Sequence, residues 1–164
     1  MMEMVRRINT TTLASLPDRR EPNVDVTCNT CHGGIARPQP IDDVMASMLE
    51  EEGIDAAIQR YRQLRTTYVG ARAYDFSFRP LNRLAERLGR ARVVDVIRFL
   101  ELNAEFNPTS LPTLILLGGS YEANGDDESA MGVYRGVLEL DADLQFYDFY
   151  AGQARDRIAA IGGE

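Results

Sequence analysis

The chain of 164 residues contains no lysine and no tryptophan, and it has only one histidine and two cysteines. Its 18 basic residues are therefore all arginines, so each cationic contact is made by a guanidinium group, which suits carboxylate partners. Together with 25 acidic residues they give a net charge of −7, which argues against free nucleic acid as a partner. No apolar run in the sequence is long enough to span a bilayer.

Aromatic residues are absent from residues 1–60, and all 13 of them lie from Tyr61 onward. We therefore divide the chain into residues 1–40, which hold the cysteines and the histidine, and residues 41–164, in which one helical pattern follows another. The prolines of ARPQP, residues 36–40, favour an extended and fairly stiff link between the two parts. A first part this short, with few apolar groups, cannot build much of a core unaided.

Strand-like alternation is nearly absent, and apolar residues recur at three- and four-residue spacing, which predicts an all-α fold. Asp42 is expected to cap the first helix of the second part, and Gly53 and Pro108 to mark breaks between helices. The predicted helices are 1–16, 42–52, 54–68, 78–89, 92–106, 111–125, 127–141 and 144–161.

The helical pairs recur at about 34 residues, the period of a helix–turn–helix repeat. In the third pair, Gly118 and Ala130 are expected to let the two helices approach closely, with Tyr134 filling the space below them. This pair resembles a tetratricopeptide repeat, and the resemblance implies an α-solenoid that serves protein–protein contact and no chemistry. The matching positions are Leu114, Leu117, Gly118, Tyr121, Ala130, Tyr134 and Val137, with weaker matches at Val96, Leu100 and Asn103 and at Ala57, Tyr61 and Leu64.

The stretch VTCNTCHGG, residues 26–34, holds both cysteines and the only histidine of the chain. Cys28, Cys31 and His32 form the CxxCH pattern by which haem c is attached. Two cysteines on one turn can each form a thioether with a vinyl group of the ring, and the adjacent histidine then binds the iron as proximal ligand. Gly33 and Gly34 follow and are expected to leave room for the ring close to the backbone.

Two other kinds of site use the same residue types. A thioredoxin-like dithiol needs its CxxC pair at the start of a helix in a βαβ context, and no βαβ pattern is visible. A structural zinc site needs about four ligands, so Cys28, Cys31 and His32 leave it one short unless a carboxylate or another chain supplies the fourth. A structural disulfide would not need His32. We therefore prefer one covalent haem c per chain over these alternatives.

A second histidine from this chain cannot be the sixth ligand of the iron, because the chain has only one. Methionine is the usual alternative, and Met/His ligation raises the reduction potential. The candidates are Met1, Met2, Met4, Met45, Met48 and Met131.

A helix motif precedes the haem motif in the order M-x-x-M-[TV]-R-x-[VI]-N, then V-x-C-x-T-C-H-x-G. The residues that match are Met1, Met4, Val5, Arg6, Ile8 and Asn9, followed by Val26, Cys28, Thr30, Cys31, His32 and Gly34. Together they resemble one haem segment of the cytochrome c subunit of photosynthetic reaction centres and of related proteins in non-phototrophic bacteria. This resemblance implies that the helix runs along the haem face and that Met1 binds the iron, with Met4 one turn further on. The family commonly carries several such segments, and this chain has one attachment motif.

The function expected from these residues is electron transfer, because a His/Met-ligated iron has no open position for a substrate. The chain is not expected to be an enzyme, since no Ser-His-Asp set or phosphate-binding loop is found. Expected partners are other redox proteins or copies of the chain itself, which would form a homo-oligomer or filament. A membrane complex to which the chain binds peripherally is a further expected partner. The exposed side of the aromatic helix 144–161 is a candidate contact surface. The alternative is a repeat scaffold with a structural or sensory haem.

Haem attachment to CxxCH takes place outside the cytoplasmic membrane, as the family resemblance implies. The segment MMEMVRRINTTT does not have the pattern of a signal peptide, because no apolar central region follows its arginines. We therefore expect a periplasmic or extracellular protein whose export signal and further upstream sequence precede Met1.

Overall fold

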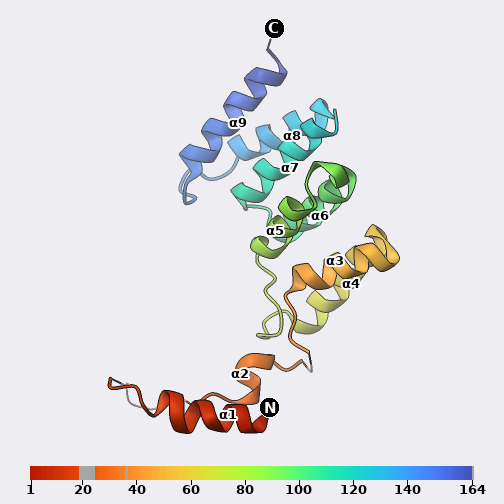
Figure 1. Ribbon diagram of the computed structural model, residues 1–164. Helices are drawn as coiled ribbons and strands as arrows, with labels where there is room; N and C mark the ends of the chain where they lie inside the picture. The colour runs from red at the N-terminus through yellow and green to blue at the C-terminus, as the bar shows by residue number, and fades with distance from the viewer. Residues whose placement is uncertain (19–24, 36, 164) are drawn as a thin grey trace.

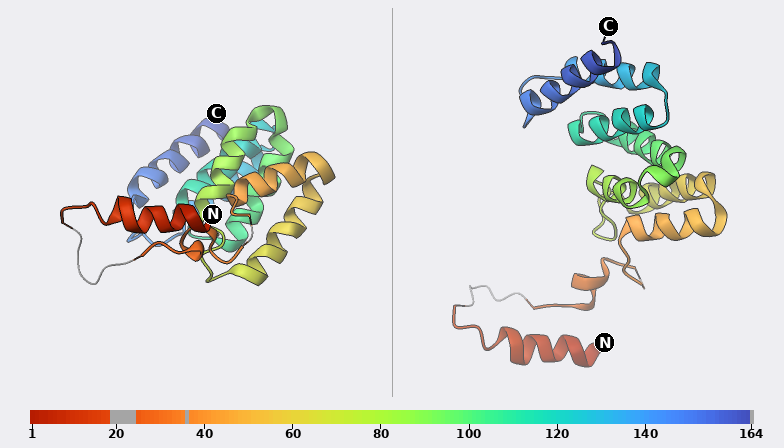
Figure 2. Two further views of the ribbon diagram at one scale, coloured as in Figure 1. Left: turned by 60° about the horizontal axis from the view of Figure 1, so that its bottom comes forward. Right: turned by 45° about the horizontal axis from the view of Figure 1, so that its top comes forward.

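The computed structural model describes residues 1–18, 25–35 and 37–163 of the chain. Within these ranges the regular elements are helices and no strand occurs, which confirms the all-α class. Figure 1 shows the helices following one another from α1 at one end of the molecule to α9 at the other, so that the two termini lie far apart. The two further views in Figure 2 show the same succession.

The boundaries of the predicted helices lie within three residues of those observed when α1 and the π-helical turn after it are taken together, whereas the short helix at Cys28–His32 was not predicted. In the first part, α1 (Met2–Arg7) continues directly into a π-helical turn (Ile8–Leu13), and the short α2 (Cys28–His32) follows later in the chain. The second part contains α3 (Ile41–Glu52), α4 (Ile54–Tyr68), α5 (Phe78–Leu88), α6 (Val93–Phe106), α7 (Leu111–Ala123), α8 (Asp127–Leu138) and α9 (Tyr147–Ile161), with a 3₁₀ turn (Arg90–Arg92) before α6.

The helices from α3 to α8 pack as three successive pairs, and α9 closes the series. α3 contacts both α4 and α5, α5 contacts α6 and α7, and α7 contacts α8 and α9. The helices α3, α5, α7 and α9 begin at residues 41, 78, 111 and 147, so the unit recurs every 33 to 37 residues. Three apolar clusters lie along this series, each shared between one pair and the next.

The buried apolar side chains of the described residues all lie between Ile41 and Ala154. Neither α1, nor the π-helical turn, nor α2 contains a buried residue. A short segment without a fully buried side chain gains little hydrophobic stabilisation of its own. The arrangement of the first part therefore depends on a few polar contacts and on what lies beside it.

α7 and α8 approach closely where Gly118 faces Tyr134. A methyl group at Gly118 would overlap the ring carbons of Tyr134, and Ala130 is fully buried on the facing helix. The Tyr134 hydroxyl donates a hydrogen bond to Glu122, whose carboxylate also pairs with Arg157 of α9 at 2.8 Å. Burial first, and the Glu122 carboxylate second, raise the pKa of Tyr134 to about 12. The close approach predicted at these positions is confirmed.

Guanidinium–carboxylate pairs join the first helical pair to the second. Asp42, expected to cap α3, instead lies inside its first turn and makes no capping hydrogen bond. Its buried carboxylate accepts from Arg83 of α5 at 3.1 Å, because the arginine of the next pair reaches it. The other pairs between these helices are Arg87–Asp43, Arg62–Glu105, Arg92–Glu50 and Arg98–Asp55, at 2.6 to 2.9 Å. Each exposed pair contributes about 0 to 1 kcal/mol.

A buried polar cluster joins the second pair to the third. Asn103 of α6 is fully buried and donates to the Asn82 side chain and to the Phe78 carbonyl of α5, both at 2.8 Å. Thr113 of α7 donates to the same Asn82 oxygen at 3.0 Å. α5, α6 and α7 thus share one network in which these buried polar groups are hydrogen-bonded. Such a network favours one placement of the three helices relative to one another.

The aromatic residues of α9 divide between two environments. Tyr147 and Tyr150 pack against the third apolar cluster, whereas Phe146 and Phe149 are 67% and 62% exposed. The helix begins three residues later than predicted, because Phe146 takes a left-handed backbone conformation with φ 63° just before it. The expectation that one side closes the series while the other stays exposed is confirmed.

Replacement of Gly118 by Ala is expected to lower the free energy of unfolding by about 1 to 3 kcal/mol, because the new methyl group meets the Tyr134 ring. The matched control is Gly132→Ala in α8, where nothing lies within 4 Å and alanine is expected to stabilise by about 0.5 to 1 kcal/mol. Urea unfolding followed by far-ultraviolet circular dichroism measures both. Equal stability of the two variants would contradict the close approach.

Candidate haem site

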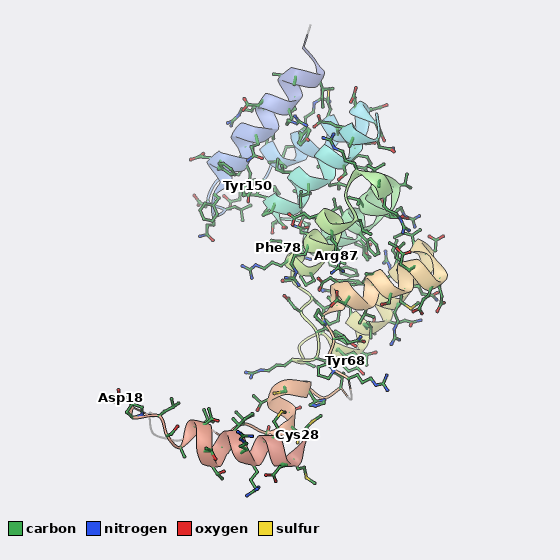
Figure 3. The ribbon with its side chains drawn as sticks, viewed as in Figure 1. Asp18, Cys28, Tyr68, Phe78, Arg87 and Tyr150 are labelled. Carbon is green, nitrogen blue, oxygen red and sulfur yellow. The ribbon has the colours of Figure 1, made fainter. Side chains whose placement is uncertain are left out.

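The short helix α2 starts at the first cysteine because a capping box precedes it. Thr27 is extended, its backbone N–H donates to Thr30 Oγ1 at 2.9 Å, and its side chain accepts from the Thr30 backbone N–H. Cys28 and Cys31 are three positions apart and therefore lie on one face of the single turn. Both thiols are free and exposed, so a ligand can reach them. Figure 3 labels Cys28 on α2.

α2 ends at Gly33, whose φ of 56° places it in the left-handed region that favours glycine. A Cβ at this position would overlap the backbone carbonyl of Arg72 and approach Ala73 Cα at 3.0 Å. The loop after α4 therefore packs directly on the end of α2. The space at Gly33, expected to accommodate a ring, is taken by this loop, whereas Gly34 has nothing within 4 Å.

The imidazole of His32 is oriented by one backbone carbonyl. Its Nδ1 lies 2.9 Å from the Ile35 oxygen, and because a carbonyl only accepts, Nδ1 carries the proton. In the neutral ring this leaves Nε2 with a free lone pair. A second ring nitrogen held by a carbonyl is the usual support of a metal-binding histidine.

Met1 is the residue that faces this lone pair. Its Sδ lies 2.8 Å from His32 Nε2, although the two residues are 31 positions apart in the sequence. Neither a thioether sulfur nor an unprotonated imidazole nitrogen has a proton to share, so the two lone pairs repel unless a cation lies between them. Metal–nitrogen and metal–sulfur bonds are each about 2.0 to 2.3 Å, so binding of one ion between these atoms requires them to move apart.

The other methionines do not share this position. Met4 is 51% exposed and Met2 82% exposed, and neither contacts His32. Met45 is fully buried in the first apolar cluster, where Met48 also packs. Met131 lies in α8, far along the series of helices. Of the six candidates, Met1 alone is brought to the histidine.

Asn9, in the π-helical turn that continues α1, joins this helical segment to the cysteine segment. Its place in the helix motif did not reveal this contact. Its side-chain Nδ2 donates to the Val26 carbonyl at 2.8 Å, and its Oδ1 accepts from the Val26 N–H at 2.8 Å. Val26 directly precedes Thr27, the capping residue of α2. The spacing of apolar residues predicts helices, but it does not predict hydrogen bonds such as those between Asn9 and Val26, which join two separate segments.

The exposed thiols of Cys28 and Cys31 and the Nε2 lone pair of His32 are the donor types that haem attachment uses. Cys28, Cys31 and His32 do not gather as a metal-binding cluster, and no group of three His, Cys, Asp or Glu side chains does so among the described residues. Across residues 1–18, 25–35 and 37–163, no helix is long and apolar enough to cross a membrane. Comparison of the chain with known protein families, curated proteins and solved structures found no match.

Replacement of Gly33 by Ala is expected to separate α2 from the loop, because the methyl group meets the Arg72 carbonyl. Gly34→Ala is the matched control. It imposes a similar backbone strain at φ 92°, of about 1 to 2 kcal/mol, but meets no neighbouring atom. Hydrogen exchange across residues 68–76 should accelerate in Gly33→Ala, where the Ala71 N–H normally donates to the Tyr68 carbonyl. Equal exchange in both variants would show that backbone strain at the glycine, and not contact with the Arg72 carbonyl, causes the change.

Proposed function

We propose that the chain is a single-haem c-type cytochrome that transfers electrons, in which Cys28 and Cys31 hold the ring and His32 and Met1 bind the iron. The observation that carries the proposal is the 2.8 Å approach of Met1 Sδ to His32 Nε2. This approach supports the pairing of a methionine with the histidine of a CxxCH motif that the resemblance to reaction-centre cytochromes implies. When bound, the haem supplies a one-electron couple between ferric and ferrous iron.

The residues of the chain divide this work between them. The Ile35 carbonyl holds the Nδ1 proton of His32, which fixes the tautomer and leaves Nε2 for the iron. Met1 would hold the iron together with His32, which would leave no coordination position for a substrate, and a thioether ligand would raise the reduction potential. Cys28 and Cys31 are exposed, so the edge of the ring that they hold is open to a redox partner.

We propose that residues 41–163 act as a tetratricopeptide-like solenoid for protein contacts. The recurring helical pairs and the close approach of Gly118 to Tyr134 support this. The partners would be other redox proteins or copies of the chain, with the exposed Phe146 and Phe149 at the closing helix as a contact surface. Haem attachment would place the protein in the periplasm or outside the cell.

A sensory haem on a repeat scaffold is the second candidate function. The observation that favours it is the exposure of Met1, which is 66% accessible although it faces His32. A ligand held at an exposed helix end can leave the iron and admit a diatomic gas, which a buried ligand does less readily.

The proposal predicts both covalent attachment of haem and ligation of its iron by Met1. The chain, made behind an export signal in a host that attaches haem c, should have the mass of one covalent haem and sharp low-spin absorption bands when reduced. Met1→Ala should lose the sixth ligand and lower the reduction potential, because a thioether raises it. Met4→Ala is the matched control on the same helix and should change neither property. An intact mass without haem would refute the proposal.

Carbon monoxide separates the two candidate functions. An electron-transfer protein with Met1 firmly on the iron should bind the gas only weakly in the reduced state, and Met1→Ala should bind it tightly. A sensor should bind it readily as wild type, with little change on Met1→Ala. Titration of the reduced protein, followed by its visible absorption, distinguishes the two.

A further inference from the structure

We propose that Asn9 is a positioning residue that keeps Met1 on the haem iron, so that it determines the strength of the iron–sulfur bond without touching the haem. This inference rests on the proposed function and extends it to a residue outside the ligand set. It is argued from the two hydrogen bonds between Asn9 and Val26, which we call the Asn9–Val26 pair.

The Asn9–Val26 pair uses both functional groups of one amide side chain. Nδ2 donates to the Val26 carbonyl and Oδ1 accepts from the Val26 N–H, each at 2.8 Å. The side chain thus makes the two hydrogen bonds that a neighbouring backbone strand would otherwise make to Val26, which is half-buried. Two parallel bonds resist rotation as well as separation, so they fix the angle at which the helix meets the cysteine segment.

The pair lies between the two iron ligands in the sequence. Met1 is eight residues before Asn9, and His32 is six residues after Val26. On one side the connection is helical, through α1 and the start of the π-helical turn, and on the other it leads through Thr27 directly into α2. Both connections are stiff because their backbones are hydrogen-bonded within themselves.

The direct covalent route between the ligands is much longer. Met1 and His32 are 31 residues apart, whereas the path through the Asn9–Val26 pair crosses eight and six residues. For flexible chains this shortening alone raises the probability that the ends meet by about threefold. Helical connections raise the probability that Met1 and His32 meet still further, because they restrict the positions that each of the two residues can take.

Between residues 1–18 and residues 26–35 the described hydrogen bonds are those of the Asn9–Val26 pair and the Met1–His32 contact itself. α1 and α2 contain no buried side chain, so apolar packing between them is weak. The Asn9–Val26 pair is therefore a main contact through which the position of Met1 is set.

The test compares Asn9→Leu with Thr10→Val in the full-length protein carrying haem. Leucine has the shape of asparagine without its polar groups, and Thr10 makes only a hydrogen bond to the Arg6 carbonyl of its own helix. Carbon monoxide competes with Met1 for ferrous iron, so its apparent affinity reports the iron–sulfur bond. Loss of two hydrogen bonds should raise this affinity about 10- to 30-fold in Asn9→Leu, whereas Thr10→Val should leave it unchanged.

A double-mutant cycle with Met1→Ala shows whether Asn9 acts through the ligand. In the absence of the thioether, Asn9→Leu should no longer change the affinity for carbon monoxide. Asn9→Leu should also lower the reduction potential and weaken the ferric charge-transfer band of the iron–sulfur bond, which a purely structural role would not do. Hydrogen exchange of the Val26 amide, whose N–H donates to Asn9, should accelerate in the same variant.

Three results would overturn the inference. An unchanged affinity for carbon monoxide in Asn9→Leu, with Met1 shown to be the ligand in wild type, would refute it alone. Persistence of the effect in the Met1→Ala background would show that Asn9 acts on the haem by another route. A wild-type protein without haem, or one whose spectrum Met1→Ala does not alter, would refute the proposed function and the inference together.

Discussion

The described residues of the first part form no hydrophobic core, and the geometry of the candidate site follows from this constraint. None of them before Ile41 is buried, so α1 and α2 gain little stabilisation from packing against each other. The macrocycle of a haem, with its large apolar faces, is the kind of body around which such helices can order. The polypeptide orders the candidate ligands with hydrogen bonds: the Thr27–Thr30 capping box, the Ile35 carbonyl on His32, and the Asn9–Val26 pair.

The second part of the chain, in contrast, is stabilised by packing between its helices. Its helices share apolar clusters, a buried amide network and arginine–carboxylate pairs, so each pair fixes the placement of the next. The two parts meet where Gly33 leaves space for the backbone of Arg72 and Ala73. Because this contact lies at the end of α2, one residue after His32, it holds the histidine side of the site on the rigid helical series.

Sequence reasoning succeeded where the signal is local. Three- and four-residue spacing gave the helices, and the small residues at positions 118 and 130 indicated a close helix pair. It was wrong about Asp42, whose position before an apolar run resembles a cap, because Arg83 of another pair competes for its carboxylate. Met1 and Met4 share one helical face, so periodicity alone could not separate them. The Asn9–Val26 pair spans 17 residues and two segments without a core, and only the folded backbone reveals it.

The exposure of Met1 and the position of Asn9 together explain why two functions compete for this site. In a protein with a haem core, a ligand stays on the iron because it is packed in place. Met1 is 66% exposed, so in the proposed haem protein its hold on the iron would depend on how closely α1 is kept in position rather than on burial. There, a firm Asn9–Val26 pair would give two permanent iron ligands and an electron carrier, while a loosened pair would free a coordination position and give a gas-binding haem. On this proposal, one side-chain amide eight residues from the ligand decides between the two kinds of protein.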